Sequence, residues 1–535
     1  MNLRNLILVG VSLVLVLRCA MQSNPTGGPR DEAPPEVSVA VPENYSTNFI
    51  GKGVLLTFDE YIVLKDPESQ VQISPPLGER LKVSVKGKTL KIDFPDTTLL
   101  QNTTYTITFG KAIEDLHEGN VLLDYKYVLS TGSDIDSSSI RGVARTAFGD
   151  EPAKGYLAML YPMGSTDSAP LKETPLYYSL TREDGSFSLN NIPEDSFKLF
   201  VLKDINLDFK ISGGGEEIGY FPQPIMAEKA PQPVIVRTYL PDPEFRFLRS
   251  KMDGYGKMNL YFFGDGRGRY SLSTKGGSLG TDPIEVSDLN GDSISVWFDP
   301  ISLSGDEIIV SIDQMARDTL SVDTTLNKPG FAQLRQIRRE GLTPNDSLSF
   351  GTSIPIRSID PNLILISAGG SDTLHPDNLI LARNREEFKI PFTFIQGGTI
   401  RTWILPGAIQ DIFGNQNEDT LTYTFKTLTE QDLSYLILTI QSQEDFPMIF
   451  ELLNEKGEVV YHKNLRISEK MDIPYLYPGK FRMRVIWDEN DNGVWDPGNY
   501  LEGKTPEWVS YYQEKIELRA NWEIELTWIL EHPRY

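Results

Sequence analysis

The loop from Asp488 to Asp496 carries an arrangement of oxygen-bearing residues that could bind a metal ion. Side-chain oxygens stand at positions one, three, five and nine, on Asp488, Asn490, Asn492 and Asp496, with glycine at position six. The main-chain carbonyl of Val494 offers a further oxygen. Hard oxygen ligands at this spacing wrap Ca²⁺. We therefore expect a structural calcium site formed by these five residues, and the alternative is a tight Asx-rich turn without metal.

Two features depart from the usual calcium pattern. Position twelve holds Asn499 in place of a bidentate glutamate, and Glu502 is the nearby carboxylate that could replace it. An earlier loop, Asp204–Asp208, keeps three alternate oxygens but has Phe209 where glycine is expected. No flanking helices are predicted, so any calcium in either loop would bind on a β scaffold and act structurally.

The other residue types that support catalysis are scattered. Asp59 and Glu60 are adjacent carboxylates, but acidic residues at a strand end are ordinarily solvated. A Gly-x-Ser-x-Gly pattern stands at Gly276–Gly280, but no helical pattern follows it, so the strand–turn–helix elbow of an α/β-hydrolase nucleophile is not indicated. The four histidines fall in different predicted modules or loops, which argues against a zinc site; they are His117, His375, His462 and His532. We expect a protein that is not an enzyme and has no catalytic cofactor.

Length and charge narrow the class of protein. The 535 residues are enough for about three to five domains. The formal net charge of -23 argues against nucleic acid as a partner, because phosphate contacts need Lys and Arg. With a single cysteine there are no disulfides, so each domain must be stable through burial alone.

The N-terminal segment predicts export and a lipid anchor. Leu6–Leu17 is an apolar run of the length of a signal-peptide core, too short to span a bilayer comfortably. Val16-Leu17-Arg18-Cys19 resembles the bacterial lipobox, although Arg18 replaces the small residue that usually precedes the cysteine. This resemblance implies a signal peptide over residues 1–19 with lipidation of Cys19. An ordinary signal peptide cut elsewhere and an uncleaved anchor are the alternatives.

The segment behind Cys19 predicts a spacer. Residues 20–35 lack periodicity and are rich in Pro, Gly and small polar residues, as in a flexible tether. The acidic export signal usual behind the cysteine is missing, so the face of the membrane stays open. We expect an outer-membrane lipoprotein, at the cell surface rather than on the periplasmic face.

Residues 36–133 predict a β-sandwich. Leu81–Val85 and Thr89–Phe94 alternate apolar and polar residues, and Thr104–Phe109 is β-branched and aromatic. Pro, Gly, Asn and Asp clusters separate these runs, as in all-β sandwiches. The order T-F-D-E, I-S-P-P, N-T-T-Y-T-I-T-F-G and A-I-E-D-L-H-E-G-N resembles the bacterial Ig-like domain of the SbsA type. That family is structural or adhesive and carries no catalytic residues.

A second kind of module follows over residues 139–241. Its I-R-G-V-A, D-G-S-F-S-L and F-K-L-F-V segments are similar to the transthyretin-like or carboxypeptidase-regulatory β-sandwich. The resemblance implies a domain that binds or spaces and does not catalyse.

The two modules recur near the C-terminus. Ala112–Asp115 matches Ala408–Asp411, and Phe197–Asp204 aligns with Phe481–Asp488. We therefore expect a second Ig-like domain over 346–430 and a second transthyretin-like sandwich over 431–535. A repeat of this kind makes a rod or arch of sandwiches. Unrelated sandwiches with similar turns are the alternative.

Residues 243–345 predict another β-sandwich between the repeated pairs. The Gly-rich stretch Gly264–Arg269 lies between two strands, so it reads as a hairpin turn rather than a phosphate-binding loop. Phe331–Arg339 carries three arginines and three spaced apolar residues. This segment predicts either a short helix or a strand linking two domains.

The whole layout is all-β, with tandem Ig-like and transthyretin-like β-sandwiches in an extended multi-domain chain, and it resembles large Bacteroidota lipoproteins. The resemblance implies a non-enzymatic envelope scaffold, a subunit of an outer-membrane protein assembly or secretion complex with protein partners such as a β-barrel. A surface adhesin or glycan-binding lipoprotein, stabilised by calcium, is the alternative.

Overall fold

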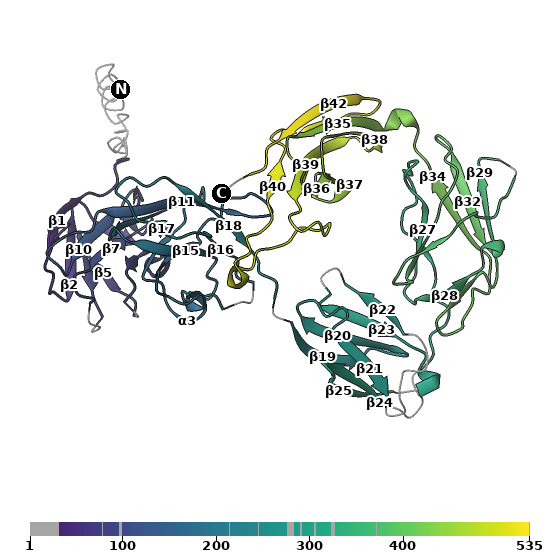
Figure 1. The fold of residues 1–535 in the computed structure, drawn as a ribbon, viewed down its shortest axis with the longest axis horizontal. Coiled ribbons are helices and arrows are strands. Elements are labelled where there is room, and N and C mark those ends of the chain that lie inside the picture. Colours follow the sequence, from purple (N-terminus) through teal and green to yellow (C-terminus); the bar gives the residue numbers. More distant parts are fainter. Residues whose placement is uncertain are drawn as a thin grey trace, which may run out of the picture.

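The computed structural model describes residues 31–533, except residues 78, 96–98, 213–214, 244, 275–282, 289–290, 304–306, 323–326 and 371. The described chain is almost entirely β-structure, arranged as five successive sandwiches that we call modules 1 to 5 (Figure 1). This confirms the all-β, multi-domain fold expected from the sequence. Among the described residues, no helix is long and apolar enough to cross a membrane. Cys19 and the expected signal peptide lie outside the described residues.

Module 1 is a sandwich whose strands alternate as the sequence predicted. In β2, Val54, Leu56 and Phe58 point inward and are almost fully buried, and each such side chain contributes about 1.5–3 kcal/mol. The sheets are β1-β2-β6-β5, β10-β7-β4 and β3-β8-β9. Their elements are β1 (Val37–Val41), β2 (Gly53–Phe58), β3 (Ile62–Leu64), α2 (Pro67–Gln70), β4 (Gln72–Ser74), β5 (Lys82–Lys86), β6 (Thr89–Asp93), β7 (Thr104–Thr108), β8 (Ile113–Asp115), β9 (Val121–Leu122) and β10 (Lys126–Ser130).

Module 4 repeats the strand pairing of module 1. Its elements are β26 (Arg335–Gln336), β27 (Leu348–Gly351), β28 (Ile356–Ile359), η2 (Pro361–Leu363), β29 (Ile364–Ala368), β30 (Ile380–Leu381), β31 (Glu387–Ile390), β32 (Thr399–Ile404), β33 (Ile409–Asp411) and β34 (Leu421–Lys426). The sheets β26-β27-β31-β30, β29-β32-β34 and β28-β33 follow the order of their module 1 counterparts. The pairing supports the duplication inferred from sequence.

Module 4 begins earlier than the sequence suggested. β26 pairs with β27, and Leu334 and Leu342 lie in the core cluster of this module. The boundary expected between residues 345 and 346 is therefore too late. The Phe331–Arg339 segment contains this edge strand and not the alternative short helix.

Modules 2 and 5 share a second topology. In each, the first strand pairs in parallel with the last, as β11 with β18 and β35 with β42. Module 2 contains β11 (Ser138–Thr146), β12 (Leu157–Pro162), α3 (Ala169–Lys172), β13 (Tyr177–Leu180), β14 (Ser186–Ile192), β15 (Ser196–Leu202), β16 (Ile218–Tyr220), β17 (Ile225–Met226) and β18 (Val234–Tyr239). Module 5 contains η3 (Glu430–Asp432), β35 (Ser434–Ser442), β36 (Met448–Leu453), β37 (Val459–Leu465), β38 (Glu469–Leu476), β39 (Gly479–Trp487), η4 (Tyr500–Glu502), β40 (Val509–Tyr511), β41 (Ile516–Leu518) and β42 (Glu523–Leu530).

Module 3 is a sandwich of its own pattern, with sheets β19-β20-β23-β22 and β21-β24-β25. Met258, Leu260 and Phe262 on β20 fill its core together with apolar residues of β23 and β24. Its elements are β19 (Arg246–Met252), β20 (Lys257–Phe263), β21 (Tyr270–Thr274), β22 (Ile284–Ser287), β23 (Ser293–Trp297), η1 (Pro300–Leu303), β24 (Glu307–Ile312) and β25 (Met315–Ser321). The Gly264–Arg269 stretch connects β20 to β21, which pair with β23 and β24 in different sheets, so it is a crossing between the two sheets and not the hairpin turn expected from the sequence.

Modules 2 to 5 form a closed ring from which module 1 projects (Figure 1). Module 3 contacts module 4 through an apolar cluster in which the rings of Trp297 and Phe413 lie 6.2 Å apart. Module 5 meets module 4 where the Tyr477 hydroxyl donates to a backbone carbonyl. Module 5 then packs on module 2, with the rings of Phe148 and Trp495 4.8 Å apart. The contacts of module 3 with module 4, of module 4 with module 5 and of module 5 with module 2 therefore close the ring.

Candidate cation-binding loop and the module contact beside it

The predicted calcium loop lies between β39 and β40 of module 5. Asp488 follows the last residue of β39 and is only 3% exposed. Its Oδ1 accepts a hydrogen bond from the backbone N–H of Asn492 (3.0 Å), and its Oδ2 accepts one from Gly493 (2.8 Å). Gly493 adopts φ +80°, a conformation that glycine takes without steric cost. The Asp488 carboxylate therefore folds the loop back upon itself.

Three of the predicted ligand side chains converge on one point. Asp496 Oδ2 accepts hydrogen bonds from the Nδ2 groups of Asn490 (2.6 Å) and Asn492 (2.7 Å). Asn490 Oδ1 accepts from the N–H of Asn492 (3.1 Å), so this amide oxygen faces a backbone donor. Val494 has an exposed side chain, and its N–H donates to Asn492 Oδ1 (2.8 Å). Because each carboxylate oxygen keeps a second lone pair, the donor set fits a hard cation such as Ca²⁺.

Glu507 is the residue of this loop that sequence spacing did not reveal. It is 3% exposed, and its two carboxylate oxygens accept from the N–H groups of Glu489 (2.8 Å) and Asp496 (3.0 Å). Burial raises its pKa to about 7; Asp496 and Asp488 add to the rise and the backbone donors oppose it. Glu507 thus closes both ends of the loop and adds a carboxylate to its buried side.

Glu502, which the sequence suggested as the substitute for the missing glutamate at position twelve, lies outside the loop. Glu502 is exposed and pairs with Lys504 at 2.6 Å. Asn499 caps the short turn η4, where its Oδ1 accepts from the N–H of Leu501 at 3.1 Å. Glu502 therefore lies away from the loop, whereas the Glu507 carboxylate hydrogen-bonds to it.

The earlier loop of module 2 repeats this hydrogen-bond pattern. Asp204 Oδ1 and Oδ2 accept from the N–H groups of Asp208 (3.2 Å) and Phe209 (2.9 Å), as Asp488 does four and five residues ahead. A buried glutamate, Glu216, accepts from the N–H of Ile205 at 3.3 Å, as Glu507 does from Glu489. Phe209 adopts φ +62° at the position of Gly493, so the fold repeats despite the side chain.

The chain that leaves the Asp488 loop forms part of the contact with module 2. Trp495 packs against Phe148, and its indole N–H donates to the carbonyl of Glu507 at 3.1 Å. The guanidinium of Arg484 lies 4.2 Å from the Phe148 ring centre. The Tyr511 hydroxyl donates to the Phe148 carbonyl at 2.6 Å. Phe148 is therefore held by three groups of module 5.

A second set of rings extends the same contact. Tyr500 packs edge-on against Phe200 and Tyr220, with ring centres 5.7 and 6.5 Å away. The guanidinium of Arg237 lies 3.9 Å from the ring centre of Trp508. Because Trp495, Tyr500 and Trp508 all lie on the excursion between β39 and β40, the Asp488 loop and the contact that closes the ring are parts of one segment.

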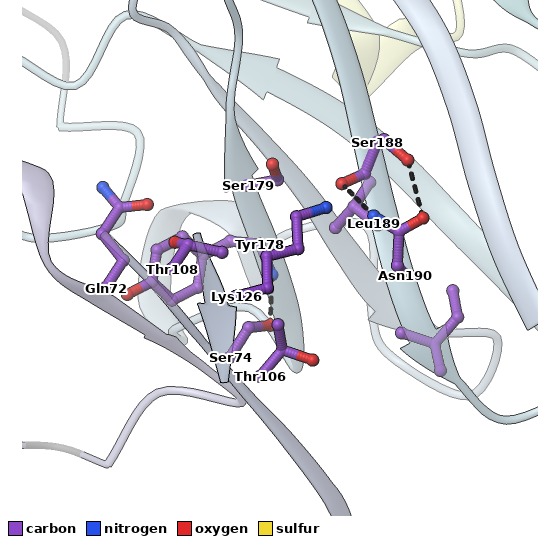
Figure 2. Close-up of a pocket in the computed structure, with 11 residues that line it drawn as sticks. Gln72, Ser74, Thr106, Thr108, Lys126, Tyr178, Ser179, Ser188, Leu189 and Asn190 are labelled. Atoms are coloured by element: carbon purple, nitrogen blue, oxygen red, sulfur yellow. Dashed lines mark hydrogen bonds between the residues drawn. The ribbon is translucent and has the colours of Figure 1, made fainter. Parts of the chain in front are cut away.

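Polar side chains line a small cavity between modules 1 and 2 (Figure 2). Its volume is about 40 Å³, enough for one or two water molecules and too small for a metabolite. Ser74 Oγ accepts from the N–H of Tyr178 at 3.0 Å and joins the two modules there. Lys126 points into the cavity in Figure 2, and burial lowers its pKa. The cavity is a polar seam between modules 1 and 2.

A wider cleft of about 970 Å³ lies between α2–β5 of module 1 and the Asp204 loop. Arg80 pairs with Glu68 at 3.6 Å on its module 1 side, and both side chains are exposed. Asp204 uses its carboxylate to hold its own loop. These groups are not arranged as a nucleophile and a base.

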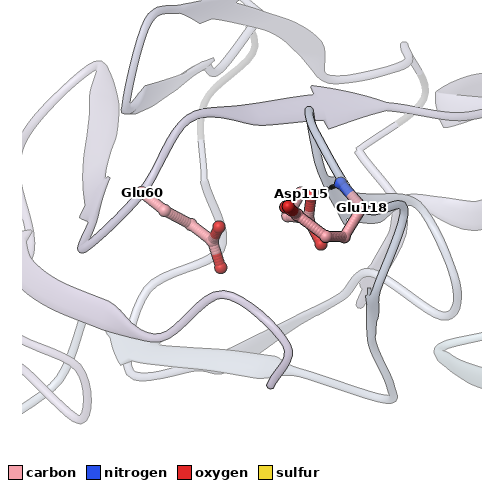
Figure 3. A group of neighbouring side chains, drawn as sticks. All are labelled: Glu60, Asp115 and Glu118. Carbon is pink, nitrogen blue, oxygen red and sulfur yellow. Dashed lines mark hydrogen bonds between the residues drawn. The ribbon is translucent and has the colours of Figure 1, made fainter. Parts of the chain in front are cut away.

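An acidic cluster in module 1 is formed by Glu60, Asp115 and Glu118 (Figure 3). The Asp115 carboxylate accepts four backbone N–H groups, from residues 117 to 120. Burial opposes ionisation, but these donors together lower the pKa of Asp115 to about 2. Its counterpart in module 4, Asp411, accepts from the N–H groups of Phe413 and Asn415, both at 2.9 Å. The cluster therefore caps a repeated turn.

The four histidines have separate surroundings, as the sequence suggested. His375 Nδ1 lies 2.9 Å from the Ile364 carbonyl oxygen, and His532 packs 4.6 Å from the Trp487 ring. His462 Nδ1 lies 3.7 Å from the Glu451 carboxylate. Among the described residues, no histidine belongs to a group of three or more His, Cys, Asp or Glu side chains placed to hold a metal ion.

Comparison with protein families identifies module 1. Residues 31–131 match the family model of the bacterial Ig-like domain. This confirms the Ig-like expectation for the first module. No curated protein sequence matches the chain.

Several solved structures resemble parts of the chain. The Bacillus anthracis TIE protein is 9% identical, with 95% of this chain and 76% of that chain covered and a TM-score of 0.14. BcpA, the major pilin subunit of Bacillus cereus, is 8% identical, with 74% and 99% covered and a TM-score of 0.14. The N-terminal part of the bacterial S-layer protein SbsC is 12% identical, with 36% and 43% covered and a TM-score of 0.14. At these values we draw no function from the likeness.

Proposed function

We propose that this chain is a non-enzymatic, lipid-anchored scaffold of the cell envelope, a subunit of an outer-membrane protein assembly or secretion complex. The observation that carries this proposal is the closure of modules 2 to 5 into a ring through Phe148 and Tyr500. Bacterial Ig-like domains are structural modules, and module 1 belongs to that family. A closed ring of sandwiches presents several outer surfaces in fixed relative positions, which suits the binding of protein partners.

The anchor in this proposal is Cys19. The lipobox-like stretch at residues 16–19 would yield an N-terminal lipid, and residues 20–35 would form the tether to module 1. A single acyl chain binds a bilayer only reversibly, whereas several acyl chains on one protein bind it stably. A lipoprotein therefore needs no membrane-spanning helix. We place the protein on the outer membrane of a Bacteroidota cell, facing outward, with a β-barrel as the expected type of partner.

The Asp488 loop is proposed as a structural calcium site. Asp488, Asn490, Asn492 and Asp496 would supply side-chain oxygens and Val494 its carbonyl. Glu507 extends this set, because its buried carboxylate lies beside Asp496. Bound calcium would stiffen the segment that carries Trp495 and Tyr500, so the metal would support ring closure and take no part in chemistry.

Affinity purification from detergent-solubilised envelopes tests the scaffold proposal. A tagged full chain should bring down an integral β-barrel protein in a fixed ratio, and Cys19→Ala should lose the lipid and the envelope fraction. Protease treatment of intact cells should cleave the protein at the surface. Retention on polysaccharide without a stoichiometric protein partner would instead support the adhesin alternative.

A further inference from the structure

A row of cations crosses the outer face of module 3, although the chain as a whole is strongly acidic. The row consists of Arg246, Arg249 and Lys251 on β19, all exposed, and we call it the basic stripe. Residues 246–274 carry a net charge of +4, whereas the whole chain carries -23. Module 3 also has no counterpart in the repeated pairs. A distinct surface therefore lies on the one module that is not duplicated.

A β-bulge aligns these three side chains. Along a regular strand, residues three apart point to opposite faces. The pairing of β19 with β20 shifts register between Phe247 and Arg249, so Leu248 is the extra residue. Arg246, Arg249 and Lys251 consequently share the solvent face, while Phe247 packs against the module 3 core. A bulge adds one residue without breaking the sheet, which is how strands re-aim side chains.

Aromatic rings of the neighbouring strand hold the two arginines. The guanidinium of Arg246 lies 5.4 Å from the ring centre of Phe263, and that of Arg249 lies 4.8 Å from Tyr261. A fourth cation, Arg269, lies over Phe245 at 4.9 Å. Within the part of the chain that the structure describes, these arginines form no ion pair. Their planar N–H forks are therefore oriented by the rings and free to bind carboxylates in bidentate fashion.

The shape of this surface restricts the ligand. The stripe runs along β19, the edge strand of its sheet, where the N–H of Ser250 donates to Asp318 of β25 at 3.2 Å. A line of cations along an extended strand suits a linear polyanion better than a compact anion. Charges on the remaining, acidic surface act over about 8 Å at physiological salt. A thin chain on the stripe approaches little acidic surface beyond the Asp318 carboxylate, which Ser250 hydrogen-bonds, whereas a membrane or a nucleic acid duplex would also cover the acidic surface around the stripe. Single-stranded nucleic acid needs bare aromatic faces, and guanidinium groups cover Phe263 and Tyr261.

We propose that the basic stripe of module 3 binds a linear, carboxylate-bearing polysaccharide. The partner is identified by charge complementarity: its carboxylates recur along a line, as the cations do on β19. The inference goes beyond the scaffold role and stands whether or not a β-barrel partner is found.

Affinity electrophoresis of the full chain through gels containing polygalacturonate tests this proposal, with dextran as the neutral probe. The wild-type chain should be retarded by polygalacturonate, less so at high salt, and not by dextran. Arg249→Gln with Lys251→Gln should weaken binding at least about tenfold. Lys82→Gln with Lys86→Gln, which removes two exposed cations from β5 of module 1, is the matched control and should bind normally.

Three results would overturn the inference. Equal weakening by both double variants would mean diffuse charge attraction, and dextran binding would mean that charge is not recognised. Tighter binding of the stripe to vesicles of anionic phospholipid than to polygalacturonate would assign it to a membrane surface. Arg249→Lys keeps the charge but loses the planar fork, so it should bind with intermediate affinity. Circular dichroism should show that every variant is folded.

Discussion

Removing the aromatic side chains that join module 2 to module 5 should open the ring. Phe148 belongs to module 2 and contacts Trp495 and Arg484, and Tyr500 belongs to module 5 and contacts Phe200. An aromatic pair contributes about 0.5–1.5 kcal/mol beyond its buried area and a desolvated cation–π pair up to about 2 kcal/mol. Each truncation should therefore cost about 2 kcal/mol of closure.

Phe148→Ala with Tyr500→Ala should together shift the open–closed equilibrium by about 4 kcal/mol, or roughly a thousandfold. Small-angle scattering should then report a larger radius of gyration, and the chain between modules 2 and 3 should become sensitive to protease. Trp522→Ala is the control, because Trp522 is 53% exposed and contacts Arg519 of its own module. An unchanged radius of gyration in a folded double variant would refute the reasoning.

Three further predictions concern single residues. Calcium at a hundred times its Kd should stabilise module 5 by about 2.7 kcal/mol, measured by thermal unfolding with and without chelator. Asp488→Asn should abolish this gain in stability. A gain that persists in the variant would place the cation elsewhere. The pKa of Asp115 is about 2, below its ordinary 3.8, so the stability it provides is complete above about pH 4 and lost towards pH 2. Asp115→Asn should flatten this acid limb of unfolding measured by circular dichroism, and an unaltered limb would contradict the assignment. Phe350 is fully buried and stacks 4.9 Å from Phe388, so Phe350→Ala should cost about 3–5 kcal/mol in urea unfolding; a loss below about 1 kcal/mol would contradict its place in the core.

Local patterns in the sequence were enough to predict the fold class. Strict alternation in stretches such as Leu81–Val85 and Thr89–Phe94 requires one buried face, and the structure pairs them as β5 and β6. The matched segments Ala112–Asp115 and Ala408–Asp411 form equivalent strands, β8 and β33, in modules with the same pairing. Alternation and turn residues involve only a few neighbouring positions, so they can be recognised in a single sequence without an alignment.

Long-range partners could not be predicted in the same way. Glu507 lies eleven positions beyond Asp496, and only the excursion between β39 and β40 returns it to the loop. Phe209 was a reason to doubt the module 2 loop, yet its backbone takes the positive φ because Asp204 and Glu216 hold the turn. The start of module 4 was misplaced because Leu334 reveals its core position only when β26 pairs with β27.

The bulge at Leu248 shows the same limit. Arg246 and Arg249 are three residues apart, so simple alternation places them on opposite faces of β19. The register shift that puts them on one face depends on pairing with β20. The basic stripe is therefore visible in the folded chain and not in the pattern of its strand.

Imaging single molecules of the full chain by electron cryo-microscopy tests the central claim most directly. We predict that averages show four sandwiches in a closed ring with a fifth projecting from one of them, without added partner. An open string of five sandwiches, with density between modules 2 and 5 absent in most particles, would contradict the closure on which the scaffold proposal rests.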